Sequence, residues 1–159
     1  VVWSGAEYRG RGRQTTWTGR ARFGGRAIQR IAKINAWNPE RRLEQRGGDT
    51  VEWDTLTTGN FGGFDAYLDD GDGGVLDIAT NHGGMVHDLA DIGLDDVTLE
   101  AGGLERRLRA FRLPEVNRHR EVTHRVTVPV RPTGDNPLWV CVTTEDGFQA
   151  WSSPIFVFR

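Results

Sequence analysis

The sequence predicts an all-β protein, a β-sandwich or jelly roll of roughly ten short strands with at most one short helical turn. Three observations support this prediction. Several segments alternate between apolar and polar residues with period 2, as strands with one buried face do. Turn residues separate these segments at short intervals, and the 159 residues include 21 glycines, which tolerate the backbone angles of tight turns.

The first third of the chain predicts three strands. Trp3 begins an edge strand, and residues 14–23 alternate regularly, with Trp17 among the apolar positions. Gly24-Gly25 is typical of a two-residue hairpin turn into residues 27–36. The alternation breaks once in this last segment, which indicates either a β-bulge or a short helical turn at residues 29–32.

The middle of the chain predicts further short strands between glycine-rich turns. Strands are expected at residues 50–57, 97–100 and 104–113, and residues 64–68 are expected to pair with residues 75–80. Residues 85–92 fit a helical turn or a strand equally well.

Residues 121–130 alternate through Val122, Val126 and Val128 and predict another strand. The C-terminal residues 135–159 are expected to be the centre of the fold. A strand at residues 138–144 is apolar on both faces, returns across a Gly147 turn, and is followed by an apolar strand at residues 155–158. We therefore expect Trp139, Trp151 and Cys141 to be buried there.

Length and composition predict one domain over residues 1–159, large enough to bury about two-thirds of its unfolded surface. The apolar runs are far shorter than the roughly 20 residues of a membrane-spanning helix, so no membrane partner is expected. An Arg-Gly-Arg tract at residues 9–13 is typical of nucleic-acid-binding segments, but its two repeats and the net charge of −2 argue against nucleic acid. The sequence begins at Val1 and is interpreted as a fragment of a larger protein; it assigns no compartment.

Charge is distributed unevenly along the chain. Residues 9–30 contain seven arginines and no acid, whereas residues 44–100 contain fourteen acids and only Arg46 as a base. The first interpretation is that these segments neutralise one another in the fold. The alternative is a face that binds anions.

Candidate site residues fall into two groups. A carbohydrate- or anion-binding surface would use aromatic rings for stacking and guanidinium groups for charge, and its candidates are Trp17, Trp37, Trp53, Arg20 and Arg22. The group that most resembles a metal site is His82, His87 and Asp88, but its spacing fits neither a strand nor a helix. The acids at residues 69–72 lack the spacing of an EF-hand loop. No metal, no cofactor and no catalytic residue are therefore predicted.

Four segments together carry a resemblance. They are Trp-Thr-Gly at 17–19 after the Arg-Gly-Arg tract, Trp-Asn-Pro-Glu at 37–40, Asp-Ile-Gly-Leu at 91–94 with Ala-Gly-Gly-Leu at 101–104, and Asp-Asn-Pro-Leu-Trp at 135–139 ending in Ala-Trp-Ser-Ser-Pro-Ile at 150–155. The set resembles the C-terminal region of large bacterial proteins whose family is described only as a domain of unknown function. The N-terminal part of those proteins is similar to the PHP-type metal-dependent phosphoesterase fold.

The resemblance implies a role without catalysis of its own. The metal ligands of such proteins lie in the N-terminal part, and no His-x-His motif in this chain matches them. The expected function is a non-catalytic accessory or structural β-sandwich of a PHP-like metallohydrolase, whose N-terminal part would be the partner. The alternative is a module that binds an acidic or neutral glycan.

Overall fold

Strands form nearly all of the regular structure in the described part of this chain, as the sequence predicts. The computed structural model describes residues 1–7, 13–36, 38–114, 121–144 and 149–158. The only helical element in these ranges is a 3₁₀ turn, η1 (Leu89–Asp91). The chain divides into two compact units, Val1–Leu113 and Pro114–Arg159, where the sequence analysis expected one domain.

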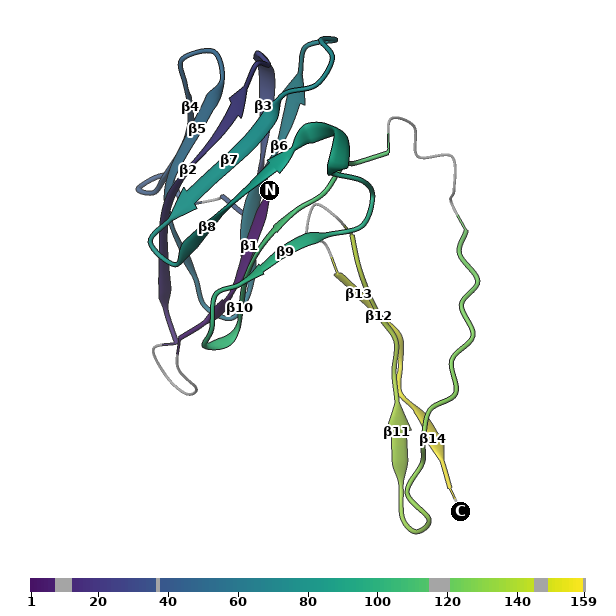
Figure 1. Cartoon of the computed structure of the whole chain (residues 1–159). Coiled ribbons are helices and arrows are strands. Elements are labelled where there is room, and N and C mark those ends of the chain that lie inside the picture. The colour runs from purple at the N-terminus through teal and green to yellow at the C-terminus, as the bar shows by residue number, and fades with distance from the viewer. Residues whose placement is uncertain (8–12, 37, 115–120, 145–148, 159) are drawn as a thin grey trace. The chain divides into compact units, whose positions relative to one another are not determined.

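The first unit is a sandwich of two five-stranded antiparallel sheets (Figure 1). One sheet has the order β3 (Ile28–Ile34), β6 (Phe61–Leu68), β1 (Val2–Ala6), β10 (Leu104–Ala110), β9 (Val97–Glu100). The other has the order β4 (Arg42–Arg46), β5 (Thr50–Thr57), β2 (Thr15–Gly24), β7 (Val75–Thr80), β8 (Gly83–Asp88).

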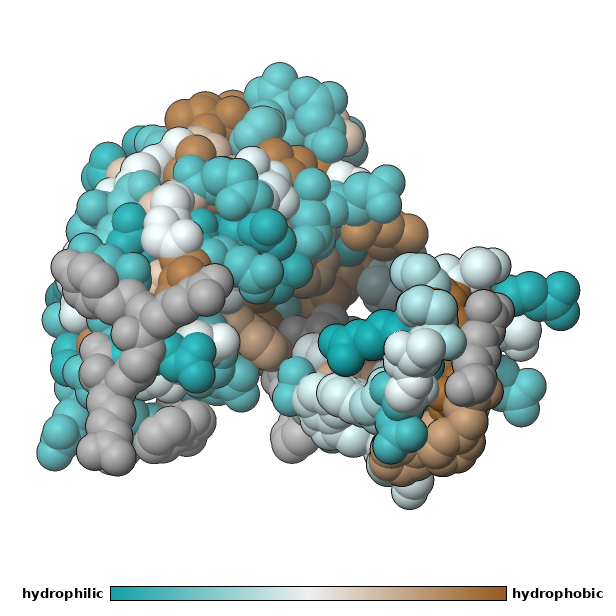
Figure 2. All heavy atoms as spheres, turned by 90° about the horizontal axis from the view of Figure 1, so that it is seen from below, coloured by the Kyte–Doolittle hydropathy of each residue, from teal (hydrophilic) through white to brown (hydrophobic). Residues whose placement is uncertain are grey.

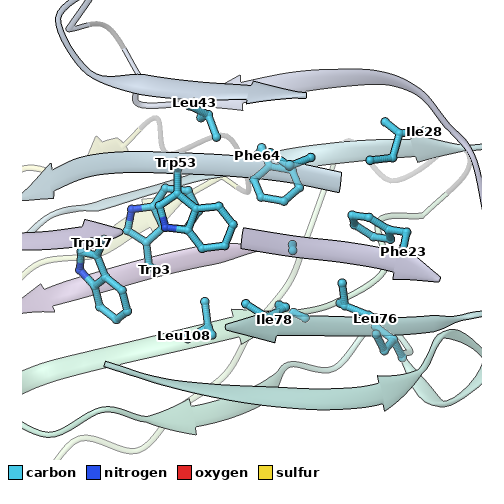
Figure 3. Packing of buried hydrophobic residues seen from close by; sticks show 14 of the residues in the cluster. Trp3, Trp17, Phe23, Ile28, Leu43, Trp53, Phe64, Leu76, Ile78 and Leu108 are labelled. Carbon is cyan, nitrogen blue, oxygen red and sulfur yellow. The ribbon is translucent and has the colours of Figure 1, made fainter. Parts of the chain in front are cut away.

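Aromatic side chains from both sheets fill the space between them (Figure 3). Trp3 of β1 and Trp53 of β5 stack with their ring centroids 4.7 Å apart and their planes within 5° of parallel. Phe64 of β6 packs at a tilt against both rings. All three side chains have no exposed surface, so the core of the protein lies in this unit rather than in residues 135–159.

Strand β1 is the middle strand of its sheet, which corrects the expectation of an edge strand at Trp3. It pairs with β6 on one side and β10 on the other. Trp3 is buried because its side chain lies in the core between the two sheets, and the preceding residue, Val2, is buried as well.

Two predicted strand pairings are wrong for the same reason. Strands β2 and β3 are not a hairpin, because the turn at Gly24-Gly25 takes the chain from one sheet to the other. Likewise β6 pairs with β1 and β3, while β7 pairs with β2 and β8. The irregularity in residues 27–36 is a break in register between Ile28 and Arg30, so the β-bulge alternative is the correct one.

The second unit consists of two small two-stranded sheets. Strand β11 (Asn136–Leu138) pairs with β14 (Ile155–Val157), and β12 (Cys141–Thr143) pairs with β13 (Gln149–Trp151). The strand expected at residues 121–130 does not form: these residues have no regular structure, and Val122 is 89% exposed. Pro129 has no N–H to donate, which weakens any ladder there.

The predicted burial of the C-terminal strands is wrong. Trp139 is 55% exposed and Trp151 is 60% exposed, and Cys141 is exposed as well. The alternation correctly identified strands in this region, but a two-stranded ribbon buries a side chain only where a further layer covers it.

Candidate functional site

Two of the predicted aromatic candidates lie inside the sandwich. Trp17 and Trp53 have no exposed surface, so neither ring can stack on a sugar at the surface. Trp17 Nε1 donates to Thr57 Oγ1 at 3.1 Å, and that hydroxyl donates to the Gly5 carbonyl at 2.8 Å. These two tryptophans therefore pack and anchor the core. The third candidate, Trp37, lies outside the described residues.

The two candidate arginines lie on the outer side of β2, beside acids. Arg22 Nε donates to Asp49 Oδ2 at 2.9 Å, and this bond holds the pKa of Asp49 below its ordinary value. Arg20 is exposed and stands opposite Glu52 in the β2–β5 register. The ion pair of Arg22 fits mutual neutralisation better than anion binding.

The neighbouring strands β4 and β5 continue this pattern. Four side chains form a network of ion pairs in which each arginine reaches both acids, with nitrogen–oxygen distances of 2.6–4.0 Å: Arg42, Arg46, Glu44 and Glu52. Exposed pairs of this kind contribute only about 0–1 kcal/mol each. Because positive and negative groups alternate here, this face lacks the single sign of charge that would attract an anionic ligand.

Arg26 has a structural role that the sequence did not reveal. Its Nε donates to Asp69 Oδ1 at 2.6 Å, a terminal nitrogen donates to the Asp69 carbonyl, and the other donates to the Gly73 carbonyl at 3.3 Å. The guanidinium group thus holds the acidic turn after β6 through one carboxylate and two backbone oxygens. Only the acidity of this turn is visible in the sequence.

This contact leads to an expected dependence of stability on pH. The hydrogen bond from Arg26 lowers the pKa of Asp69, so the folded state binds the Asp69 proton less readily than the unfolded state does. The resulting stabilisation is present above the ordinary pKa of 3.8 and is lost as the pH falls through the lowered value. Urea unfolding between pH 2 and pH 6 measures the effect. As the pH falls, the free energy of unfolding should decrease less for Arg26→Gln than for the unsubstituted chain.

Arg20→Gln is the matched control, since Arg20 makes no such bond to an acid in the described structure. The free energy of unfolding of this variant should decrease on acidification as much as that of the unsubstituted chain. If the free energy of unfolding fell equally on acidification in Arg26→Gln and Arg20→Gln, the role assigned to Arg26 would be contradicted.

The three metal-like residues do not come together. His82 lies in the turn before β8, whereas His87 and Asp88 lie at the far end of that strand. His82 Nε2 is 2.9 Å from the Thr16 carbonyl, and its ring meets the Trp17 ring edge-on at 4.7 Å. In the described part of the chain no three His, Cys, Asp or Glu side chains are grouped as metal ligands.

Asn81, which the sequence analysis did not single out, explains how this corner is held. Its side chain accepts from the Thr18 N–H at 3.0 Å and donates to the Thr16 carbonyl at 2.9 Å, while its backbone N–H donates to the Thr18 carbonyl. The amide thereby extends the β2–β7 ladder beyond Thr80. Asparagine can do this because it carries both a donor and an acceptor.

The second unit offers a surface of a different kind. Seven large apolar side chains between β11 and the C-terminus are each at least half exposed, and we call them the apolar ribbon: Trp139, Val140, Val142, Trp151, Ile155, Phe156 and Phe158. Figure 2 shows brown, apolar side chains at the molecular surface. Large exposed apolar patches mark interaction sites in soluble proteins, whereas single exposed apolar residues are ordinary, and here seven such residues fall between Trp139 and Phe158.

Comparison of the chain with protein-family models, with curated proteins and with solved structures gives no match. In the described ranges no helix has the length and apolar character that crossing a membrane requires.

Proposed function

We propose that this chain is a non-catalytic structural β-sandwich, accessory to a larger PHP-like metallohydrolase, and that its second unit makes protein contacts. The observation that carries the proposal is the contrast between the two units. The first has a closed aromatic core and an outer face of paired charges, whereas the second displays the apolar ribbon.

The burial of Trp17 and Trp53 weighs against the glycan-binding alternative. Stacking on a sugar needs an accessible ring face, and the rings of these two side chains are enclosed by other core residues. The ion pairs beside Arg22 likewise reduce the attraction for an acidic glycan. The contact role is therefore the function that the geometry supports best.

The proposal is tested by activity and by metal content. The purified chain should hydrolyse no chromogenic phosphomonoester, with or without added Mn²⁺ or Zn²⁺, and should retain no stoichiometric metal after purification without chelator. About one equivalent of zinc, iron or manganese per chain, lost in His82→Ala, would contradict a non-catalytic role.

A further inference from the structure

The strands that carry the apolar ribbon, β11 to β14, are too small to bury its side chains by themselves. Strands β11 to β14 are three residues long, and each belongs to a sheet of two strands. Two-stranded ribbons are at best marginally stable in water. Half or more of the surface of Trp139, Trp151 and Phe156 remains exposed, so this unit gains stability from any surface that covers these side chains.

Three of the four strands of the ribbon lack the features that normally prevent strand association, and only the fourth, β11, contains a proline, Pro137. Strands β12, β13 and β14 contain no charged residue and no proline. By contrast β4, an edge strand of the sandwich, presents Arg42, Glu44 and Arg46. Charges and prolines are common means of blocking pairing at sheet edges, and an uncharged apolar edge is open to another strand.

The exposed apolar area, summed over both faces of the ribbon, is close to that of one side of a protein interface. Four aromatic side chains of the ribbon are at least half exposed: Trp139, Trp151, Phe156 and Phe158. At about 150–250 Å² for each aromatic side chain, and with three aliphatic residues added, the area is on the order of 700 Å². A standard interface buries about 800 Å² on each partner.

Building on the protein-contact role, we propose that the partner of the apolar ribbon is the same ribbon of a second copy of this chain. An antiparallel strand edge is complementary to its own copy about a twofold axis, and symmetric dimers of this kind are the commonest oligomers. Because β12, β13 and β14 carry no charge, two copies would place no like charges opposite each other.

The test measures the molecular mass of the full chain by sedimentation velocity between about 1 and 100 µM. The unsubstituted chain should form a closed dimer. Val142→Lys and Trp151→Glu should each raise the dimer dissociation constant at least tenfold, because each places a charge in the contact. Both side chains are half exposed or more, so the urea midpoint of the sandwich should not change.

Val86→Lys is the matched control. Val86 lies in β8 of the sandwich and is 63% exposed, and this variant should dimerise like the unsubstituted chain. A chain that stays monomeric at 100 µM, a dimer unaffected by both ribbon substitutions, or open-ended oligomers would each overturn the proposal.

Two further outcomes identify a different partner and also overturn it. The first is a monomer that binds vesicles of neutral phospholipid through Trp151. The second is a monomer that binds a co-expressed PHP-like part and loses that binding in Val142→Lys. In the second case the accessory function would stand while the self-association failed.

Discussion

Replacing Trp53 with alanine should lower the free energy of unfolding by about 3–5 kcal/mol, the usual cost of removing a large aromatic side chain from a core. Trp53 has no exposed surface and contacts both Trp3 and Phe64. The cavity would lie between the two sheets, where β-strand backbones can collapse only slightly. Urea unfolding followed by far-UV circular dichroism at pH 7 measures the loss.

Trp53→Phe separates packing from polarity. The indole N–H of Trp53 is buried without a hydrogen-bond partner among the described residues, and such a donor is costly to desolvate. Phenylalanine removes that donor and retains most of the ring contact, so its cost should be clearly below that of alanine. Trp151→Ala is the external control and should cost less than about 1 kcal/mol, because Trp151 is 60% exposed. Equal losses at positions 53 and 151 would contradict the assignment of the core.

The fold class could be predicted because alternation and turn residues are local properties. The strand predicted at residues 50–57 has the observed limits of β5, and the alternation from Thr15 to Phe23 matches the buried positions of β2. Each depends only on how one strand presents its two faces.

Partners and burial could not be predicted, because they depend on distant parts of the chain. The sequence around Trp151 is as apolar as that around Trp53, yet Trp53 is buried between two five-stranded sheets, whereas Trp151 belongs to a two-stranded sheet and is 60% exposed. The same limit explains the pairing errors, since in a sandwich consecutive strands such as β2 and β3 often belong to different sheets.

At the candidate site, ion pairs could be predicted from the sequence, but contacts with the backbone of distant residues could not. The uneven distribution of arginines and acids suggested ion pairs between residues 9–30 and 44–100, and Arg22 with Asp49 and Arg26 with Asp69 are such pairs. The backbone carbonyls that Arg26 also binds carry no signal in the sequence. The same is true of Asn81, which bonds to β2 because its own strand β7 ends at Thr80 while β2 continues to Thr15.

Gly5→Ala should be among the most damaging single substitutions in the sandwich. Gly5 has a φ of +93°, which costs a residue with a side chain about 1–2 kcal/mol. It lies at the irregularity between Ser4 and Ala6 in the β1–β10 register. An added Cβ would lie 2.4 Å from the Glu105 carbonyl oxygen and 2.5 Å from Arg106 Cα, so β10 would have to move.

Because these contacts are with backbone atoms, no side-chain rotation can relieve them, and overpacking adds about 1–3 kcal/mol. The combined loss in the free energy of unfolding should be about 2–5 kcal/mol. Gly47→Ala isolates the backbone contribution: Gly47 has a φ of +64°, and nothing lies within 4 Å of its added Cβ. Its loss should be about 1–2 kcal/mol. Urea unfolding of the two variants compares these losses directly, and a Gly5→Ala variant no less stable than Gly47→Ala would show that β10 yields to the added methyl group at little cost.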